Sequence, residues 1–390
     1  MTKSADLPRI NIPSTLIIAG GASRKAGTEA KRLGIRRALV VTDPYLEKIG
    51  LADQVQQDLA KENVESALFA GVDPDPSVAN MQAGLAMLQD AKADGIVAIG
   101  GGSSIDCAKA MSIMSRNEGT IADYMGYHKI PKAGVPMIAI PTTAGTGSEV
   151  TKVTVITDTD RNVKMMLLDV HLLPTAALVD YRLTMTMPKP LTAAVGVDSL
   201  THAIEAYVSK KAQPVSDFIA LESARLIAMN LRTACREPDN VAAREAMMRG
   251  ATLGGIAFSN ASVALVHGMS RPIGAHFHVP HGLSNAMLLP AVTRFSVEAA
   301  PTRYAHLARH VGLANVTDDT AACSELVESL DQLNADLEVP TPRDYGIDRA
   351  AYEKVIPEMA ESALASGSPS FNPRIVTAEE IGKLYRECYA

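Results

Sequence analysis

The residues of this chain whose types and spacing most clearly suggest a chemical role are one aspartate and three histidines. Asp198 and His202 lie four residues apart in the segment GVDSLTHAIEAY, and His267 and His281 fall within the stretch HGMSRPIGAHFHVPHG. Side chains at positions i and i+4 share one face of a helix, so Asp198 and His202 can bind one ion from the same side. With His267 and His281 from two further segments, the set offers one carboxylate and three imidazoles. Such donors suit zinc or iron with room for one exchangeable ligand.

Each of these residues also has an ordinary structural interpretation. An aspartate near the start of a helix often only caps it, and a histidine on an apolar face is usually a hydrogen-bonded core residue. The cluster His276, His278 and His281 complicates the choice. Alternation along an extended segment would put His276 and His278 on one side and His281 on the other. Spacing alone does not choose among the three.

Composition narrows the class of protein. With 390 residues, 47% of them hydrophobic, the chain can form two or three domains with substantial cores. The formal charge of −6 and the absence of Lys/Arg clusters argue against nucleic acid or an anionic membrane surface as the partner. We therefore expect small-molecule ligands.

Cysteine usage and the N-terminus indicate a compartment. Cys107, Cys235, Cys323 and Cys388 are scattered without CxxC pairing, which favours reduced, buried thiols. The opening MTKSADLPRINIP has no apolar core of the signal-peptide type, and no later run reaches membrane-spanning length. These features predict a cytoplasmic protein.

The pattern along the chain predicts two domains. Up to about Pro190, short β-rich runs such as RALVVTD and GIVAIGGGS alternate with helical stretches, which indicates a parallel sheet with crossover helices. The runs MIAIP, KVTVITD, VKMMLL and AALVD are expected as further strands around that sheet. Beyond them the spacing is helical almost throughout. We predict an α/β domain over residues 1–190, an all-helical domain over residues 191–390 and a cleft between the two.

Two small-residue loops in the first half indicate nucleotide binding. In GIVAIGGGSSIDCAKA a buried strand ends in Gly100, Gly101 and Gly102, and a helix begins near Ser103. Glycines let the backbone approach a pyrophosphate, and the helix N-terminus favours its charge. The second loop, PTTAGTGSEVT, brings hydroxyls and backbone N–H groups that suit phosphate or ribose. Together the loops favour a dinucleotide over a plain turn.

Asp43 ends the run RALVVTD, where an acidic side chain can bind ribose hydroxyls and repel a 2′-phosphate. Its structural alternative is a helix cap before Pro44. In the GxGxxG fingerprint the acid follows the glycines, whereas Asp43 precedes them. The arrangement therefore differs from an ordinary Rossmann unit.

These segments carry a resemblance to a known family. GGGSSIDCAKA, PTTAGTGSEVT, GVDSLTHAIEAY, HGMSRPIGAHFHVPHG and the terminal FNPRIVTAEEIGKLY resemble the iron-containing (group III) alcohol dehydrogenases over nearly the whole chain. The resemblance implies the dehydroquinate synthase-like fold, with an N-terminal α/β nucleotide-binding domain and a helical metal domain flanking the active site. It also implies a dimer that uses an N-terminal strand, for which STLIIAG is suited.

The resemblance also assigns residues. It implies that Asp198, His202, His267 and His281 are the metal ligands, and that His276 and His278 lie near the site without binding the ion. The family's NAD-binding residues fall on Asp43, Gly101, Gly102, Ser103, Asp106, Thr142, Thr143, Ser148, Thr151 and Lys164.

One position departs from the family pattern. Many relatives have a histidine four residues after the third ligand, where it is thought to relay the alcohol proton, and here that position is Arg271. A guanidinium stays protonated and cannot be a general base. Arg271 is therefore expected to contact the cofactor, a polar substrate end or a nearby acid, with protons leaving through water and ribose hydroxyls.

The function implied is reversible hydride transfer between a small primary alcohol or diol and NAD, with Fe²⁺ or Zn²⁺ in the metal site. Three alternatives remain open. A hydroxyacid–oxoacid transhydrogenase would keep its NAD bound, and a metal-dependent lyase of the same fold would need a basic cluster for a substrate phosphate. A structural subunit would not need the metal ligands.

Overall fold

The structure is a computed structural model that describes residues 9–161 and 163–389. It divides into two compact units. The N-terminal unit comprises residues 11–185, and the C-terminal unit comprises the described residues 9–10 and 186–389. Within the described residues, no helix has both the length and the apolar character needed to cross a membrane.

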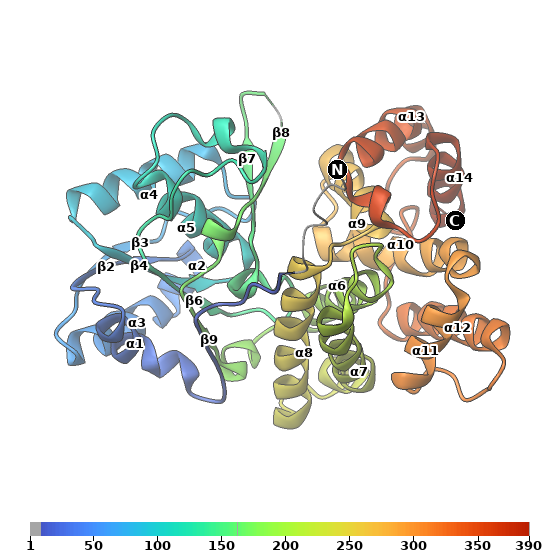
Figure 1. Ribbon diagram of the computed structural model, residues 1–390, viewed down its shortest axis with the longest axis horizontal. Coiled ribbons are helices and arrows are strands. Elements are labelled where there is room, and N and C mark those ends of the chain that lie inside the picture. The colour runs from blue at the N-terminus through green and yellow to red at the C-terminus, as the bar shows by residue number, and fades with distance from the viewer. Residues whose placement is uncertain (1–8, 162, 390) are drawn as a thin grey trace, which may run out of the picture. The chain divides into compact units, whose positions relative to one another are not determined.

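A six-stranded parallel sheet forms the centre of the N-terminal unit (Figure 1). In spatial order its strands are β1 (Thr15–Ile18), β9 (Ala176–Val179), β6 (Met137–Pro141), β4 (Gly95–Gly100), β2 (Arg37–Val41) and β3 (Glu65–Phe69). Every residue of β4, β6 and β9 is buried, as expected for parallel strands covered on both faces.

Helices cover both faces of this sheet. The unit's helices are α1 (Ala26–Arg32), α2 (Pro44–Lys48), α3 (Leu51–Lys61), α4 (Val78–Asp90) and α5 (Gly102–Met114). Val97 and Ile99 of β4 pack in one core with residues of α1 and α3. Ile96 and Ala98 pack in a second core with residues of α4 and α5. The alternation follows from the two-residue repeat of a strand, and Figure 1 shows the two helix layers.

The expectation that all later β-rich runs join the main sheet is only partly correct. β6 and β9 do join it, but β7 (Val153–Asp158) and β8 (Val163–Leu168) form an antiparallel pair in a separate sheet with β5 (Gly126–Tyr127). The paired residues Ile156 and Met165 are both buried in the α4/α5 core. Packing on this core, which the β-rich composition of the two runs does not specify, therefore selects the second sheet.

The C-terminal unit consists of helices, as the sequence predicts. They are α6 (Lys189–Val208), α7 (Pro214–Arg236), α8 (Val241–Asn260), α9 (Leu265–Phe277), α10 (His281–Ser296), α11 (Pro301–His310), α12 (Asp319–Asp336), α13 (Arg349–Ala365) and α14 (Ala378–Tyr389). The long helices α6, α7 and α8 pack against one another (Figure 1), and α10 packs against both α6 and α9.

The four cysteines are free and buried, which confirms the expected thiols. Burial raises the pKa of Cys107 and of Cys388 to about 12, so both stay protonated and unreactive.

Candidate metal centre and cofactor loops

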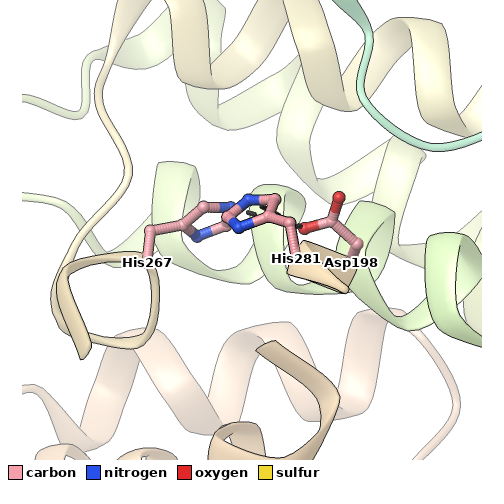
Figure 2. A group of neighbouring side chains, drawn as sticks. All are labelled: Asp198, His267 and His281. Atoms are coloured by element: carbon pink, nitrogen blue, oxygen red, sulfur yellow. Dashed lines mark ion pairs between the residues drawn. The ribbon is translucent and has the colours of Figure 1, made fainter. Parts of the chain in front are cut away.

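Three helices bring the predicted metal ligands together. Asp198 and His202 lie in the middle of α6, His267 in the first turn of α9, and His281 is the first residue of α10. The Nε2 atoms of His267, His202 and His281 lie 3.4, 3.9 and 4.0 Å from Asp198 Oδ1. Figure 2 shows both rings of His267 and His281 pointing at the Asp198 carboxylate.

The spacing of these donor atoms fits a divalent cation. Metal–ligand bonds of roughly 2.1 Å in a tetrahedral site separate neighbouring donors by about 3.4 Å. The observed distances from Asp198 Oδ1 to the three histidine nitrogens are 3.4–4.0 Å. A small movement of these side chains would therefore bring all four donor atoms to the separation of a tetrahedral site. Ligand atoms of Asp198, His267 and His281 all lie within 4.8 Å of one another, and the His202 ring stacks on that of His267 at 4.4 Å.

Burial around the four side chains is uneven. The side chains of Asp198 and His267 are 2% and 3% exposed, whereas that of His281 is 47% exposed. A cation here would be enclosed on the α6 and α9 side and approachable beside His281. Phe258 covers His202 with its ring stacked at 4.2 Å.

A glycine permits the close approach of α10 to α6. A Cβ atom built on Gly282 would lie 2.8 Å from the backbone oxygen of Ala194 and 3.3 Å from the Asp198 Cβ atom. Any side chain here would push the start of α10 away from α6. Gly282 therefore sets the distance between His281 and Asp198.

Glu205 orients His267 and was not identified from the sequence. Its buried carboxylate accepts hydrogen bonds from the backbone N–H groups of Ala264 and Val266 at 2.8 and 2.6 Å, and lies 2.7 Å from His267 Nδ1. A proton on Nδ1 in this contact leaves Nε2 as the nitrogen that faces Asp198. Since Glu205 follows Asp198 by seven residues and His202 by three, helical periodicity was the signal available.

The electrostatics of the centre favour positive charge. Burial alone would lower the pKa of His267, but the carboxylates of Glu205 and Asp198 outweigh it and raise that pKa to about 9. Burial likewise opposes ionisation of Asp198, but the three histidines hold its pKa far below the usual range. Without metal the centre retains a proton, which a cation would displace on binding.

The other histidines occupy different surroundings. His276 Nε2 lies 3.8 Å from Glu358 Oε1, and His278 ends α9 in the left-handed conformation. Among the described residues, neither joins the cluster of Asp198, His267 and His281. Arg271, one turn after His267 on α9, donates to the Ser368 hydroxyl at 3.2 Å.

In the N-terminal unit, the predicted cofactor residues follow three adjacent strands. Asp43 comes after β2, Gly101 after β4 and Thr142 after β6, and these strands are neighbours in the sheet. Their carboxyl ends lie at one edge because the strands are parallel. The strand order also reverses beside β2, which pairs with β3 on one side and β4 on the other. Ligands of open α/β sheets bind at such a switch point.

The two small-residue loops adjoin each other. A Cβ atom on Gly101 would lie 3.5 Å from Thr143 Cγ2, and one on Gly102 would lie 3.0 Å from Thr146 Cγ2. Gly102 is the first residue of α5, and Ser103 donates its hydroxyl to the Pro74 carbonyl. The packed loops leave the N–H groups at the start of α5 next to a backbone without side chains, which suits a phosphate.

Three of the predicted cofactor residues also share an internal network around Lys109. Ser148 and Thr151 each accept a hydrogen bond from the buried Lys109 ammonium at 3.0 Å, and Asp106 accepts from Ser148 Oγ at 2.5 Å. The Asp106 carboxylate lies 3.9 Å from Lys109 Nζ. These contacts fix the second loop onto α5. Sequence reasoning missed Lys109, for which the available signal was its position three residues after Asp106 in α5.

Asp43 and Lys164 have partners of their own. Asp43 Oδ1 accepts from the N–H groups of Tyr45 and Leu46 at 2.9 and 3.0 Å, so the cap considered from the sequence is formed. Lys164, on β8, pairs with the exposed Asp75 at 2.9 Å.

Comparison with known proteins identifies the chain's relatives. Residues 13–181 match the model of the iron-containing alcohol dehydrogenases, and residues 192–389 match that of the C-terminal region of the same family. The chain is 37% identical to the NAD-dependent methanol dehydrogenase of Bacillus methanolicus, over 96% of this chain and 98% of that protein. It is also 37% identical to the 1,3-propanediol dehydrogenase of Citrobacter freundii, over 97% of this chain and 98% of that protein.

A solved structure agrees with this relationship. The crystal structure of a 1,3-propanediol oxidoreductase superimposes with a TM-score of 0.95 at 37% identity, and the match covers 98% of this chain and all of that one. The chain therefore belongs to the iron-containing alcohol dehydrogenase family, and is an oxidoreductase.

Proposed function

We propose that this enzyme reversibly oxidises a small primary alcohol or diol with NAD. The observation that carries the proposal is the convergence of three histidine nitrogens within 3.4–4.0 Å of one buried Asp198 oxygen. We assign NAD binding to the N-terminal unit and the metal to the C-terminal unit. The methanol and 1,3-propanediol dehydrogenases among the relatives support a small substrate.

The bound groups supply the reactive chemistry. A divalent cation stabilises the alkoxide form of an alcohol and polarises the carbonyl of the product, and NAD accepts or returns the hydride. The donor set accepts both iron and zinc, and the family supports Fe²⁺ as the resident metal.

The residues of the chain position these groups. Glu205 fixes the His267 ring, and Gly282 sets the spacing of His281 from Asp198. Gly101, Gly102 and the start of α5 hold the pyrophosphate in our proposal, and the Asp43 carboxylate binds the ribose. Arg271 is always a cation and cannot take the alcohol proton, so a group other than Arg271 must accept it.

We also propose a cytoplasmic homodimer. Four buried free thiols suit a reducing compartment. β1 lies at an edge of the main sheet, which leaves one of its sides for pairing with a second copy. Light scattering on the purified protein tests the dimer. Leu16→Pro is the variant that blocks strand pairing, because Thr15 and Ala19 donate to the β9 side and the alternation along β1 turns the N–H of Leu16 to the open edge.

The test of the activity is release of free NADH. Anaerobically purified protein loaded with Fe²⁺ or Zn²⁺ is assayed with NAD against short primary alcohols, terminal diols and hydroxy acids. Accumulating NADH with alcohols or diols supports the proposal. Reduction of an added oxo acid by a hydroxy acid without free NADH would instead identify a transhydrogenase.

A further inference from the structure

Asn285 lies at the centre of the ligand cluster. It is fully buried on α10, one turn after His281. Its amide nitrogen Nδ2 donates to Asp198 Oδ1 at 2.6 Å and lies 3.2 Å from His267 Nε2 and 3.3 Å from His281 Nε2. One nitrogen thus approaches three of the four donor atoms that would bind the cation.

The other end of the same amide has no such partner. Asn285 Oδ1 is buried and finds no hydrogen-bond partner among the residues that the structure describes. Leaving a buried carbonyl oxygen unpaired is costly. This cost is offset because the amide nitrogen donates a hydrogen bond to the buried, negatively charged Asp198 carboxylate.

The two orientations of the amide are favoured under opposite conditions. Turned over, the amide would place its oxygen close to Asp198 Oδ1, where two acceptors repel each other. A divalent cation among the ligands reverses this preference, because it attracts the amide oxygen and repels the N–H groups. Oxygen is also a donor that iron and zinc accept.

We propose that Asn285 is a placeholder for the cation. In the metal-free protein its amide nitrogen binds the Asp198 carboxylate beside the rings of His267 and His281, and on metal binding the amide turns its oxygen toward the ion. The inference rests on the proposed metal centre. It makes Asn285 a positioning residue that keeps the ligand set assembled before the metal arrives.

Two substitutions separate this role from ordinary packing. Asn285→Leu keeps the approximate volume and removes both the donor and the oxygen. Asn285→Asp keeps an oxygen and replaces the donor by a second carboxylate next to Asp198. Asn334→Leu is the matched control, because Asn334 donates to the Ala286 carbonyl of the same helix at 2.7 Å and belongs to no ligand contact.

The experiment measures Zn²⁺ affinity by competition with a chromophoric chelator, and the thermal unfolding midpoints of the metal-free and Zn²⁺-loaded full-length protein. Asn285→Leu should bind Zn²⁺ about 10–100-fold more weakly, the usual loss when a group that orients metal ligands is removed. Asn285→Asp should lower the metal-free midpoint yet bind Zn²⁺ at least as tightly as the wild type. Asn334→Leu should lower both midpoints equally without changing the affinity.

Two results would overturn the placeholder role. One is wild-type Zn²⁺ affinity in Asn285→Leu, and the other is an equal loss of affinity in Asn285→Leu and Asn285→Asp. Failure of the wild type to bind Zn²⁺ or Fe²⁺ would overturn the metal centre itself, and so is distinguishable from both.

Discussion

Glu205 Oε2 lies 2.7 Å from His267 Nδ1, with both side chains almost fully buried. The carboxylate thereby fixes the ring nitrogen that points away from Asp198. This contact, rather than the position of His267 in an apolar run, determines how the histidine faces the metal centre.

We expect Glu205→Gln to weaken metal binding by about 10–100-fold. Glu205 accepts from two backbone N–H groups as well as from the His267 ring, and the amide N–H₂ of a glutamine would face at least one of these donors. Metal titration and the metal content after dialysis check the loss. Glu222→Gln, in a half-buried pair with Arg225 on α7, is the control and should bind metal normally. Equal metal affinity in both variants would contradict the role of Glu205 in orienting His267 for metal binding.

The ligand set is tested by truncation. Asp198→Ala and His267→Ala should each lose metal and activity together while circular dichroism shows an intact fold, because each removes a donor from the shell. His276→Ala and His278→Ala should retain the metal. An empty site in His278→Ala with a filled site in His267→Ala would contradict the assignment.

Asp43 is predicted to select NAD over NADP by repelling a 2′-phosphate. Since Asp43 also caps α2, Asp43→Asn is the sharper substitution, because it keeps a capping oxygen and removes the charge. The ratio of kcat/KM for the two cofactors should shift by about 1–3 kcal/mol toward NADP, and Asp43→Gly should shift it in the same direction. An unchanged ratio in both variants would leave Asp43 as a cap alone.

Arg271 is predicted to bind either the cofactor or an anionic substrate end. Arg271→Ala and Arg271→His are assayed on neutral alcohols and on hydroxy acids of matched length, with NAD affinity measured separately. A loss of activity confined to hydroxy acids indicates substrate recognition, and weaker NAD binding indicates the cofactor role. Ser368→Ala removes the observed hydroxyl partner and is the control. Small, equal losses on all substrates with unchanged NAD affinity would show that Arg271 only steadies its surroundings.

Lys109 is predicted to make stability depend on alkaline pH. Burial lowers the pKa of Lys109 to about 8, whereas a lysine in the unfolded chain has a pKa of about 10.4. Between these values the folded protein has lost the proton that the unfolded chain retains. The Lys109 contribution to the free energy of unfolding therefore increases with pH in this window, by at most about 3 kcal/mol.

Urea unfolding of the metal-loaded wild type and of Lys109→Met at pH values below 8 and near 10 measures this contribution. The difference in the free energy of unfolding between the two proteins should change with pH. The wild type should become more stable relative to Lys109→Met as the pH rises. The exposed Lys354, substituted in the same way, should show a constant difference in the free energy of unfolding from the wild type. Parallel pH profiles for Lys109→Met and the wild type would contradict the prediction.

Local spacing in the sequence determined much of the site. The helical repeat places Asp198 and His202 on one face of α6, and the glycine run after a buried strand begins α5. The same repeat places Glu205 on that face, although its role depends on α9 arriving beside it. Short-range periodicity is encoded residue by residue, so these features follow from the sequence itself.

Only the tertiary structure decided which distant groups meet. The sequences of β7 and β8 are as β-rich as those of β6 and β9. Strands β7 and β8 nevertheless form a second sheet, because Ile156 and Met165 pack into the α4/α5 core. Ser148 and Thr151 are predicted cofactor residues, and only the fold shows that both hydroxyls also accept hydrogen bonds from Lys109. Asn285 appears in the sequence as an ordinary helix residue, and only the packing of α10 against α6 and α9 places its amide among the metal ligands. Such contacts depend on how helices and strands far apart in the chain pack together, which residue spacing does not specify.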